Sequence, residues 1–248
     1  MRRLAWFAMV LFSSGSAHAG RTFYGWLQDS QVMPERGAEI ATFVQEENYL
    51  SQADNLRDTT WWIAPSIGIN DQLELTIPVQ FAWDRSDHTP PRSNFTEYGL
   101  DLKYRFVTTD PVDKPDFAPA IRARVERIVI GPRDRWDVRT DLIGTYESGL
   151  FAAAINVGVQ GNVGPDTQYF QLVPGAGVSI DTTISDIRVG AEVFGEIALN
   201  EDGSGNYSWV AAGPNIEWSH GRSWVSGSYG IGLYHIRDAP RLNWGIAF

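Results

Sequence analysis

Hydrophobic and polar residues alternate along most of the chain, most clearly in residues 73–84, LELTIPVQFAWD. Every second side chain from Leu73 to Trp83 is apolar, whereas Glu74 and Asp84 fall on the opposite face. Successive side chains of a β-strand point to opposite faces, so a period of two predicts a strand. The stretch is longer than the roughly 5–6 residues usual in globular sheets and suits a tilted membrane crossing of about 9–11 residues. We therefore expect one face in lipid and the other wet or internally paired.

The same alternation recurs as far as the C-terminus, with turn-forming stretches between the apolar runs. A closed sheet satisfies every backbone polar group within a membrane, and single-chain bacterial barrels have even strand numbers. We predict an all-β fold, a transmembrane up-and-down antiparallel β-barrel of about twelve strands. The expected strands are residues 37–48, 59–69, 73–84, 95–108, 117–130, 135–147, 150–163, 168–180, 184–198, 207–219, 223–234 and 241–248.

The lengths of the expected connections distinguish two ends of the barrel, because outer loops are long and periplasmic turns short in such proteins. Both termini then fall in the periplasm, and residues 109–116 form an unusually long periplasmic turn. For the apolar faces of 59–69 and 73–84 to coincide, Ile69 should pair with Leu73 across a three-residue turn. The expected outer loops are 49–58, 86–94, 199–206 and 235–240, and the tight turns lie near Asn70, Ser148, Asp181 and His220.

Tryptophans support this orientation, because aromatic side chains gather at both interfaces of a membrane barrel. A soluble periplasmic sandwich remains the alternative fold, but it gives no reason for such a distribution. Trp61, Trp83, Trp136 and Trp209 fall at expected outer ends of strands, and Trp218, Trp224 and Trp244 at periplasmic ends.

The N-terminus has the features of an export signal. Arg2 and Arg3 precede an apolar run, and Ala17-His18-Ala19 forms a cleavage site, so residues 1–19 are expected to be a signal peptide. Residues 20–36 are expected to be a periplasmic lead-in and 37–248 the barrel. The chain has no cysteine and a formal net charge of −10, which argues against disulfides and against nucleic acid as a partner.

Two resemblances extend this picture. The last strand, RLNWGIAF ending in Phe248, resembles the C-terminal signal by which outer-membrane barrels are recognised for assembly. The hairpin GINDQLELTIPVQ, with the signal peptide and the proline-containing lead-in, resembles the family labelled putative MetA-pathway of phenol degradation. These resemblances imply a bacterial outer-membrane barrel, contact with the barrel assembly machinery and passage of small, including aromatic, compounds.

Charged residues on the polar faces of the strands are the main functional candidates. Neighbouring strands would bring them together across the lumen. They could form a paired network that fills the interior, because buried charges must be paired, or a constriction that selects solutes by charge. The candidates for lining the pore are Glu74, Asp101, Lys103, Arg105, Arg122, Arg124, Glu126, Arg139, Asp141, Arg188, Glu192 and Glu196.

Enzymatic signals are weak. Asp87-His88 faintly resembles the pairing in outer-membrane proteases, and His220 near Ser219 and Ser223 faintly resembles the outer-membrane phospholipase. Neither supplies a complete nucleophile, base and orienting group. We expect no catalytic site, cofactor or metal, and prefer a narrow channel for small solutes. The alternatives are a closed structural or binding barrel whose outer loops contact a partner, and an outer-membrane hydrolase.

Overall fold

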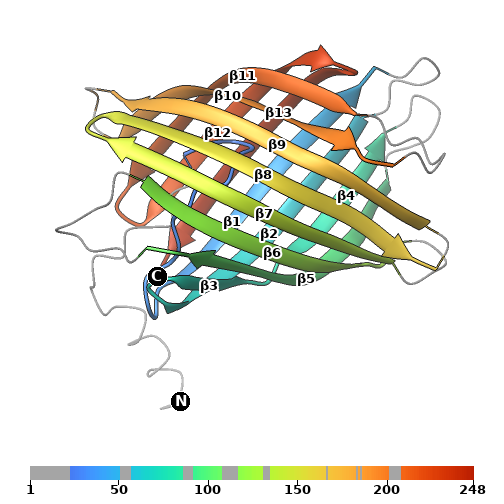
Figure 1. Cartoon of the computed structure of the whole chain (residues 1–248), viewed down its shortest axis with the longest axis horizontal. Coiled ribbons are helices and arrows are strands. Elements are labelled where there is room, and N and C mark those ends of the chain that lie inside the picture. The colour runs from blue at the N-terminus through green and yellow to red at the C-terminus, as the bar shows by residue number, and fades with distance from the viewer. Residues whose placement is uncertain are drawn as a thin grey trace.

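The computed structural model describes residues 23–50, 57–85, 92–107, 117–130, 135–165, 167–182, 184, 186–200 and 208–248. They form a closed antiparallel β-barrel (Figure 1). No helix in these ranges is long and apolar enough to cross a membrane. The strands are β1 (Ala38–Tyr49), β2 (Arg57–Asn70), β3 (Leu73–Thr76), β4 (Val79–Arg85), β5 (Arg92–Arg105), β6 (Phe117–Ile128), β7 (Arg135–Ser148), β8 (Phe151–Gly164), β9 (Thr167–Asp181), β10 (Ile187–Ala198), β11 (Trp209–His220), β12 (Ser223–Tyr234) and β13 (Ile236–Ala247).

Segments β3 and β4 are two halves of one strand, so the barrel has the expected twelve. Both halves pair with β2 on one side and β5 on the other. The interruption falls at Ile77 and Pro78, where proline has no N–H to donate to a neighbour. Hydrogen bonds still cross it: Ile77 N–H donates to the Pro65 carbonyl at 2.9 Å, and Gly99 N–H to the Pro78 carbonyl at 3.1 Å.

Pairing between the first and last strands closes the barrel. β1 lies antiparallel to β13, with Glu39 opposite Ala247 and Gln45 opposite Arg241. The Phe248 N–H donates to the Ala38 carbonyl at 2.8 Å, which continues the pairing to the end of the chain. Among the described strands, closure leaves no edge unpaired, which is the condition for a sheet within lipid.

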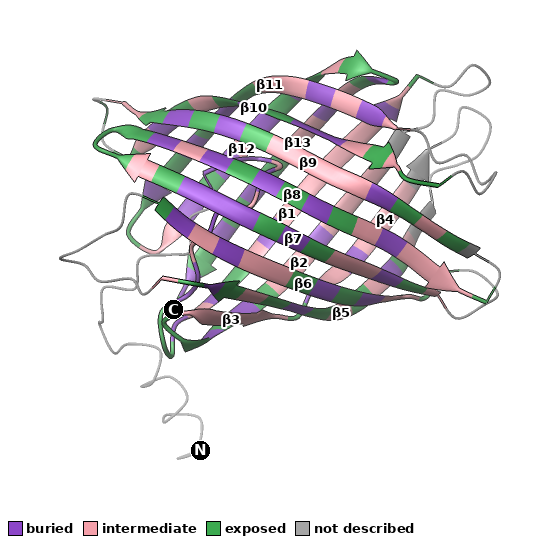
Figure 2. Cartoon of the chain, viewed as in Figure 1, coloured by how far each residue is buried: buried purple, intermediate pink, exposed green. Residues whose placement is uncertain are grey.

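The side chains sort by face as the alternation predicts. Along β5, Leu100 is 55% exposed and Leu102 44%, whereas Asp101 between them is 6% exposed. Bands of exposed and buried residues alternate along the strands in Figure 2. An apolar exterior around a charged interior is the reverse of a soluble protein and typical of a lipid-facing barrel.

The turn between β2 and β3 differs from the expected three-residue form. Asn70, not Ile69, pairs with Leu73, and Gly68 pairs with Glu74. Ile69 is therefore an extra residue in a β-bulge, and the turn itself is shorter. The bulge restores the face that a two-residue turn would otherwise have reversed, so the expected pairing was wrong although the apolar faces do coincide.

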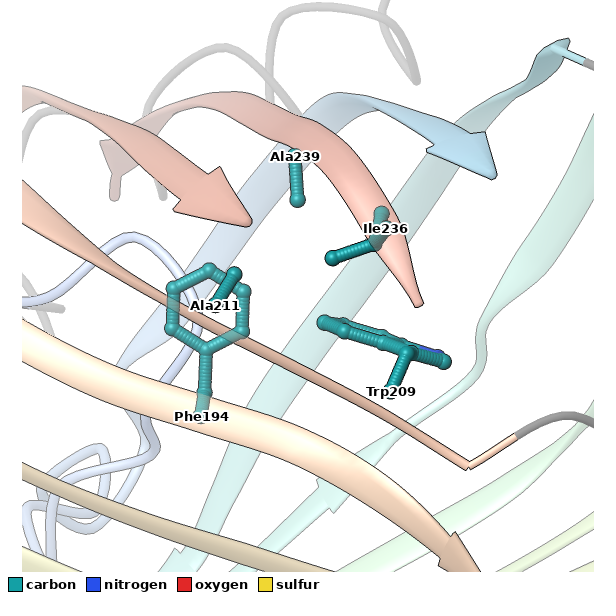
Figure 3. Close-up of a cluster of buried hydrophobic side chains, with 5 residues drawn as sticks. All are labelled: Phe194, Trp209, Ala211, Ile236 and Ala239. Atoms are coloured by element: carbon teal, nitrogen blue, oxygen red, sulfur yellow. The ribbon is translucent and has the colours of Figure 1, made fainter. Parts of the chain in front are cut away.

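The expected outer loop at 235–240 is also wrong. β13 begins at Ile236, directly after a turn at His235, whose φ is 52°. Ile236 and Ala239 are buried in the barrel interior (Figure 3). The polar Arg237 and Asp238 broke the alternation, which made this part of the strand read as a loop.

Two of the seven tryptophans lie on the wrong face for an aromatic girdle. Trp136, Trp218 and Trp244 are exposed on the outside, as expected. Trp209 and Trp224 are 1% and 3% exposed and point into the lumen. Trp224 donates its indole N–H to Glu39 at 2.9 Å, which gives a buried donor its partner.

Residues 23–34 lie inside the barrel. This part of the chain, here called the luminal segment, is drawn in dark blue inside the strands in Figure 1. Tyr24, Leu27 and Met33 are almost fully buried against inner strand faces. Composition could not reveal this position, because the partners of the segment are supplied by distant strands.

Candidate functional site

Glu192 on β10 holds the luminal segment by its backbone. The carboxylate of Glu192 accepts N–H groups from three consecutive residues: Gly25 at 3.1 Å, Trp26 at 3.0 Å and Leu27 at 3.2 Å. Successive backbone N–H groups form a concavity suited to an anion. The negative charge of Glu192 is therefore used to fix the segment, which the sequence prediction of a pore-lining role did not foresee.

Other luminal side chains form hydrogen bonds with backbone groups along the rest of the segment. The Asn156 amide accepts the Gln28 N–H at 2.6 Å and donates to the Gln28 carbonyl at 2.8 Å. Ser30 N–H donates to the Thr145 hydroxyl at 3.0 Å, and Met33 N–H to Glu74 at 2.8 Å. Buried backbone groups outside regular structure need such partners. The segment is thus bonded to the wall along its length.

The segment passes very close to the wall at Gly25. A Cβ atom at this position would lie 2.2 Å from Cβ of Ser228 on β12 and 2.9 Å from Oε1 of Glu192. Only glycine allows this approach, because any other side chain would overlap the serine.

Trp26 anchors the segment in an aromatic cluster. Phe194, Trp209, Ala211, Ile236 and Ala239 from β10, β11 and β13 form this cluster (Figure 3). The Trp26 ring stacks on Phe194 with centroids 4.7 Å apart and meets Trp209 edge-on at 5.8 Å. Its indole N–H donates to the Ala239 carbonyl at 3.1 Å. One side of the lumen is thereby filled.

A cavity of about 460 Å³ remains in the lumen beside the segment. It is bounded by Trp26, Gln28 and Asp29 of the segment and by inner faces of the barrel. Polar and charged side chains dominate this lining. The barrel wall contributes Thr60, Thr76, Gln80, Glu97, Asp101, Lys103, Arg122, Arg124, Asp137 and Arg139.

The predicted charged residues of β5, β6 and β7 form an interlocked network. Arg122 lies between two carboxylates: it hydrogen-bonds to Asp101 and has a nitrogen 3.8 Å from an oxygen of Asp141. Arg139 forms a salt bridge of 2.9 Å to the same Asp141. The strand register explains why these charges meet, because Arg122 on β6 is paired with Asp141 on β7.

A second group lies next to it. Arg124 reaches Glu126 at 2.9 Å and Asp137 at 3.2 Å, and all three side chains are buried. Salt bridges also join Lys103 to Glu74 at 3.9 Å and Arg188 to Asp181 at 2.7 Å. These pairs fit the interior network that the sequence offered as the alternative to a charge filter.

All twelve sequence candidates lie on inner faces of strands, and they divide into two groups. Arg105, Glu126, Asp141, Arg188 and Glu192 are buried outside the cavity lining. The other seven contribute to its wall: Glu74, Asp101, Lys103, Arg122, Arg124, Arg139 and Glu196. Whether these seven contact a passing solute stays a prediction.

The sequence missed an alternating stack of arginines and aromatic rings on the cavity wall. The Arg241 guanidinium lies 3.9 Å from the Phe43 ring centroid, Phe43 stacks on Trp62 at 5.2 Å, and Arg124 covers Trp62 at 4.8 Å. We call these four residues the arginine–aromatic stack. Phe43 belongs to β1, whose poor alternation follows from its inward apolar residues, Ala41 and Phe43. This irregular alternation was the only sequence signal that an aromatic residue of β1 points into the lumen.

The histidines make no catalytic set in the described ranges. His220 bonds through Nδ1 to Asp186 at 2.8 Å at the exposed rim, whereas its neighbour Ser219 is buried. His220 and Ser219 point to opposite faces of β11, so they do not meet as a catalytic pair. No group of three metal-ligating side chains occurs in the part of the chain described. Asp87 and His88 lie outside it.

The closed sheet, apolar exterior and charged lumen define an outer-membrane type of β-barrel. Solved structures share this fold: the COG4313 outer membrane channel from Pseudomonas putida F1 matches with a TM-score of 0.62 and 11% identity, over 90% of this chain and 99% of that one. The translocator domain of autotransporter NalP from Neisseria meningitidis matches with a TM-score of 0.51 and 12% identity, over 100% of this chain and 94% of that one.

The KdgM porin in complex with disordered oligogalacturonate is a third match, with a TM-score of 0.55 and 9% identity over 85% of this chain and 99% of that one. No family model matches the sequence, and no curated protein matches it. At these identities the likeness establishes the fold alone. Because channels and a translocator share it, function must be argued from the lumen.

Proposed function

We propose that the protein is a channel of the bacterial outer membrane through which small solutes pass without an energy source. The observation that carries this proposal is the polar cavity of about 460 Å³ beside the luminal segment. Polar solutes need a path lined by hydrogen-bonding groups, and the lining supplies them from both the segment and the wall. A known outer membrane channel and a porin with the same fold support the proposal.

Export and insertion complete the proposal. Residues 1–19 would be removed as a signal peptide, so the mature chain would begin at Gly20 and residues 37–248 would form the barrel. The strand ending in Phe248 would be recognised by the barrel assembly machinery, and the apolar exterior would contact outer-membrane lipid. Small aromatic compounds are the solutes that the family resemblance favours. We expect no nucleic-acid partner, cofactor or metal.

Solute entry into liposomes tests this function. The chain from Gly20, refolded into liposomes, should cause swelling with a monosaccharide and far less with a trisaccharide, because the segment narrows the lumen. Heat-modifiable migration on a gel confirms folding, and liposomes without protein give the baseline. Folded protein that produces no swelling with either sugar would contradict the channel.

The second candidate is a closed barrel that acts as a structural or binding module. The hydrogen bonds that tie the luminal segment to the wall favour it, because a firmly held segment could block passage. Such a barrel would cause no swelling, and the outer loops would then be the place to seek a partner. A hydrolase would need one histidine whose replacement abolishes turnover in a folded barrel; we propose no enzymatic activity.

A further inference from the structure

Arg241 occupies a central place on the cavity wall. It lies on β13 between Gln45 of β1 and Ser228 of β12 in the strand register. Its guanidinium covers the Phe43 ring at 3.9 Å and lies 5.2 Å from the ring centroid of Trp26. The cation is therefore held between the barrel wall and the luminal segment, with aromatic surface on both sides.

The hydrogen-bonding capacity of Arg241 is largely unused. A guanidinium has five N–H donors, and the Nε of Arg241 donates to the Asn243 amide oxygen at 3.0 Å. Within the residues described, Arg241 takes part in no salt bridge, whereas Arg122, Arg124 and Arg139 each bind a carboxylate. The terminal nitrogens of Arg241 keep accessible surface in the cavity, which the residue lines. These donors are thus open to the lumen.

Neither of the carboxylates near Arg241 forms a salt bridge with it in the described ranges. Glu192 accepts the backbone N–H groups of the luminal segment, and Glu47 accepts the Gln45 side-chain amide at 2.9 Å. A cation removed from bulk water is stabilised best by an anion, and the planar guanidinium matches a carboxylate through two parallel hydrogen bonds. The arrangement leaves the space for that anion in the cavity itself.

The surroundings restrict the kind of anion. The rings of Trp26, Phe43 and Trp62 all contribute to the lining, so apolar surface lies beside the free donors. A cavity of about 460 Å³ falls within the roughly 300–1,000 Å³ of small-molecule sites. Both features favour a small carboxylate with an apolar or aromatic body over a bare inorganic anion.

We propose that Arg241 is a binding site for small organic carboxylates in the lumen. As a step in solute passage the site depends on the proposed channel function, but the binding itself does not require an open channel. Arg241 supplies the paired donors, and the adjoining rings contact the body of the ligand. The other arginines of the wall remain engaged in the interior network.

Calorimetric titration of the refolded protein in detergent micelles tests the site. Sodium benzoate should bind, acetate should bind at least about tenfold more weakly, and benzyl alcohol should not compete, because both charge and ring are needed. Arg241→Gln should weaken benzoate binding at least about tenfold, and Arg241→Lys should give an intermediate loss because it keeps the charge without the planar fork. Arg237→Gln on the same strand, at an exposed position, is the matched control.

Each outcome decides the proposal. Equal benzoate affinity in the parent and in folded Arg241→Gln, or no benzoate binding to the folded parent, would overturn it, as would equal binding of benzyl alcohol. Benzoate binding by a barrel that produces no swelling would support the site and refute the channel. Swelling without benzoate binding would refute the site and leave the channel. Should Arg241→Gln fail to fold, the Arg241→Lys titration decides alone, and an unchanged affinity would contradict the proposal.

Discussion

Individual charges in the lumen act mainly as fixed structural pairs. Arg124 illustrates this, because it holds both Glu126 and Asp137 and lies over the Trp62 ring. The alternation of the sequence placed Arg124 inward, but it could not say that its charge would be fully engaged. Arg241 is the converse: the sequence placed it in the last expected strand but not among the lining candidates, so its open donors were missed.

Removing Arg124 should therefore destabilise the barrel more than it alters passage. Arg124→Ala leaves two buried carboxylates without their cation, which typically costs about 3–5 kcal/mol. Denaturant unfolding of the refolded protein, monitored by heat-modifiable migration, measures this loss of stability. The exposed pair of Arg36 with Glu35 provides the control, and Arg36→Ala should leave the midpoint unchanged. Equal midpoints for Arg124→Ala and the parent would show that the network contributes nothing.

Among the elements of the structure, the luminal segment decides how much of the lumen is filled. The strands could be predicted because period-two alternation reports which face meets lipid, and most strand bounds agree closely. The segment could not, because its residues have no periodic pattern and its partners, such as Glu192 and Asn156, lie more than a hundred positions away in the sequence. Trp209 and Trp224 were assigned to the outside for the same reason: an aromatic residue that packs on an internal segment looks like a girdle residue.

A change at Gly25 should displace this segment. In Gly25→Ala the new Cβ would overlap Ser228, whose Cβ lies 2.2 Å away, so the segment must shift and the conductance step should increase. Adding Ser228→Gly removes the overlapping atom and should return the step toward that of the parent. Single-channel recordings of both variants measure this. Identical steps in Gly25→Ala and the parent would contradict a segment that limits flow.

For the whole molecule, a closed barrel supplies a stable wall and the chain itself fills part of the lumen. The apolar exterior, the interlocked charges and the bonded segment all follow from one requirement, that polar groups within a membrane find partners. The remaining cavity is then the only part of the described structure in which we propose that solutes pass. Its connection to both sides of the membrane is the central claim.

Conductance of the chain from Gly20 in a planar bilayer under a salt gradient tests that claim most directly. We predict discrete current steps with a measurable reversal potential, because a polar lumen with fixed charges conducts ions and discriminates between them. A silent bilayer, with folded protein confirmed by heat-modifiable migration, would contradict it and would mean that the luminal segment closes the barrel.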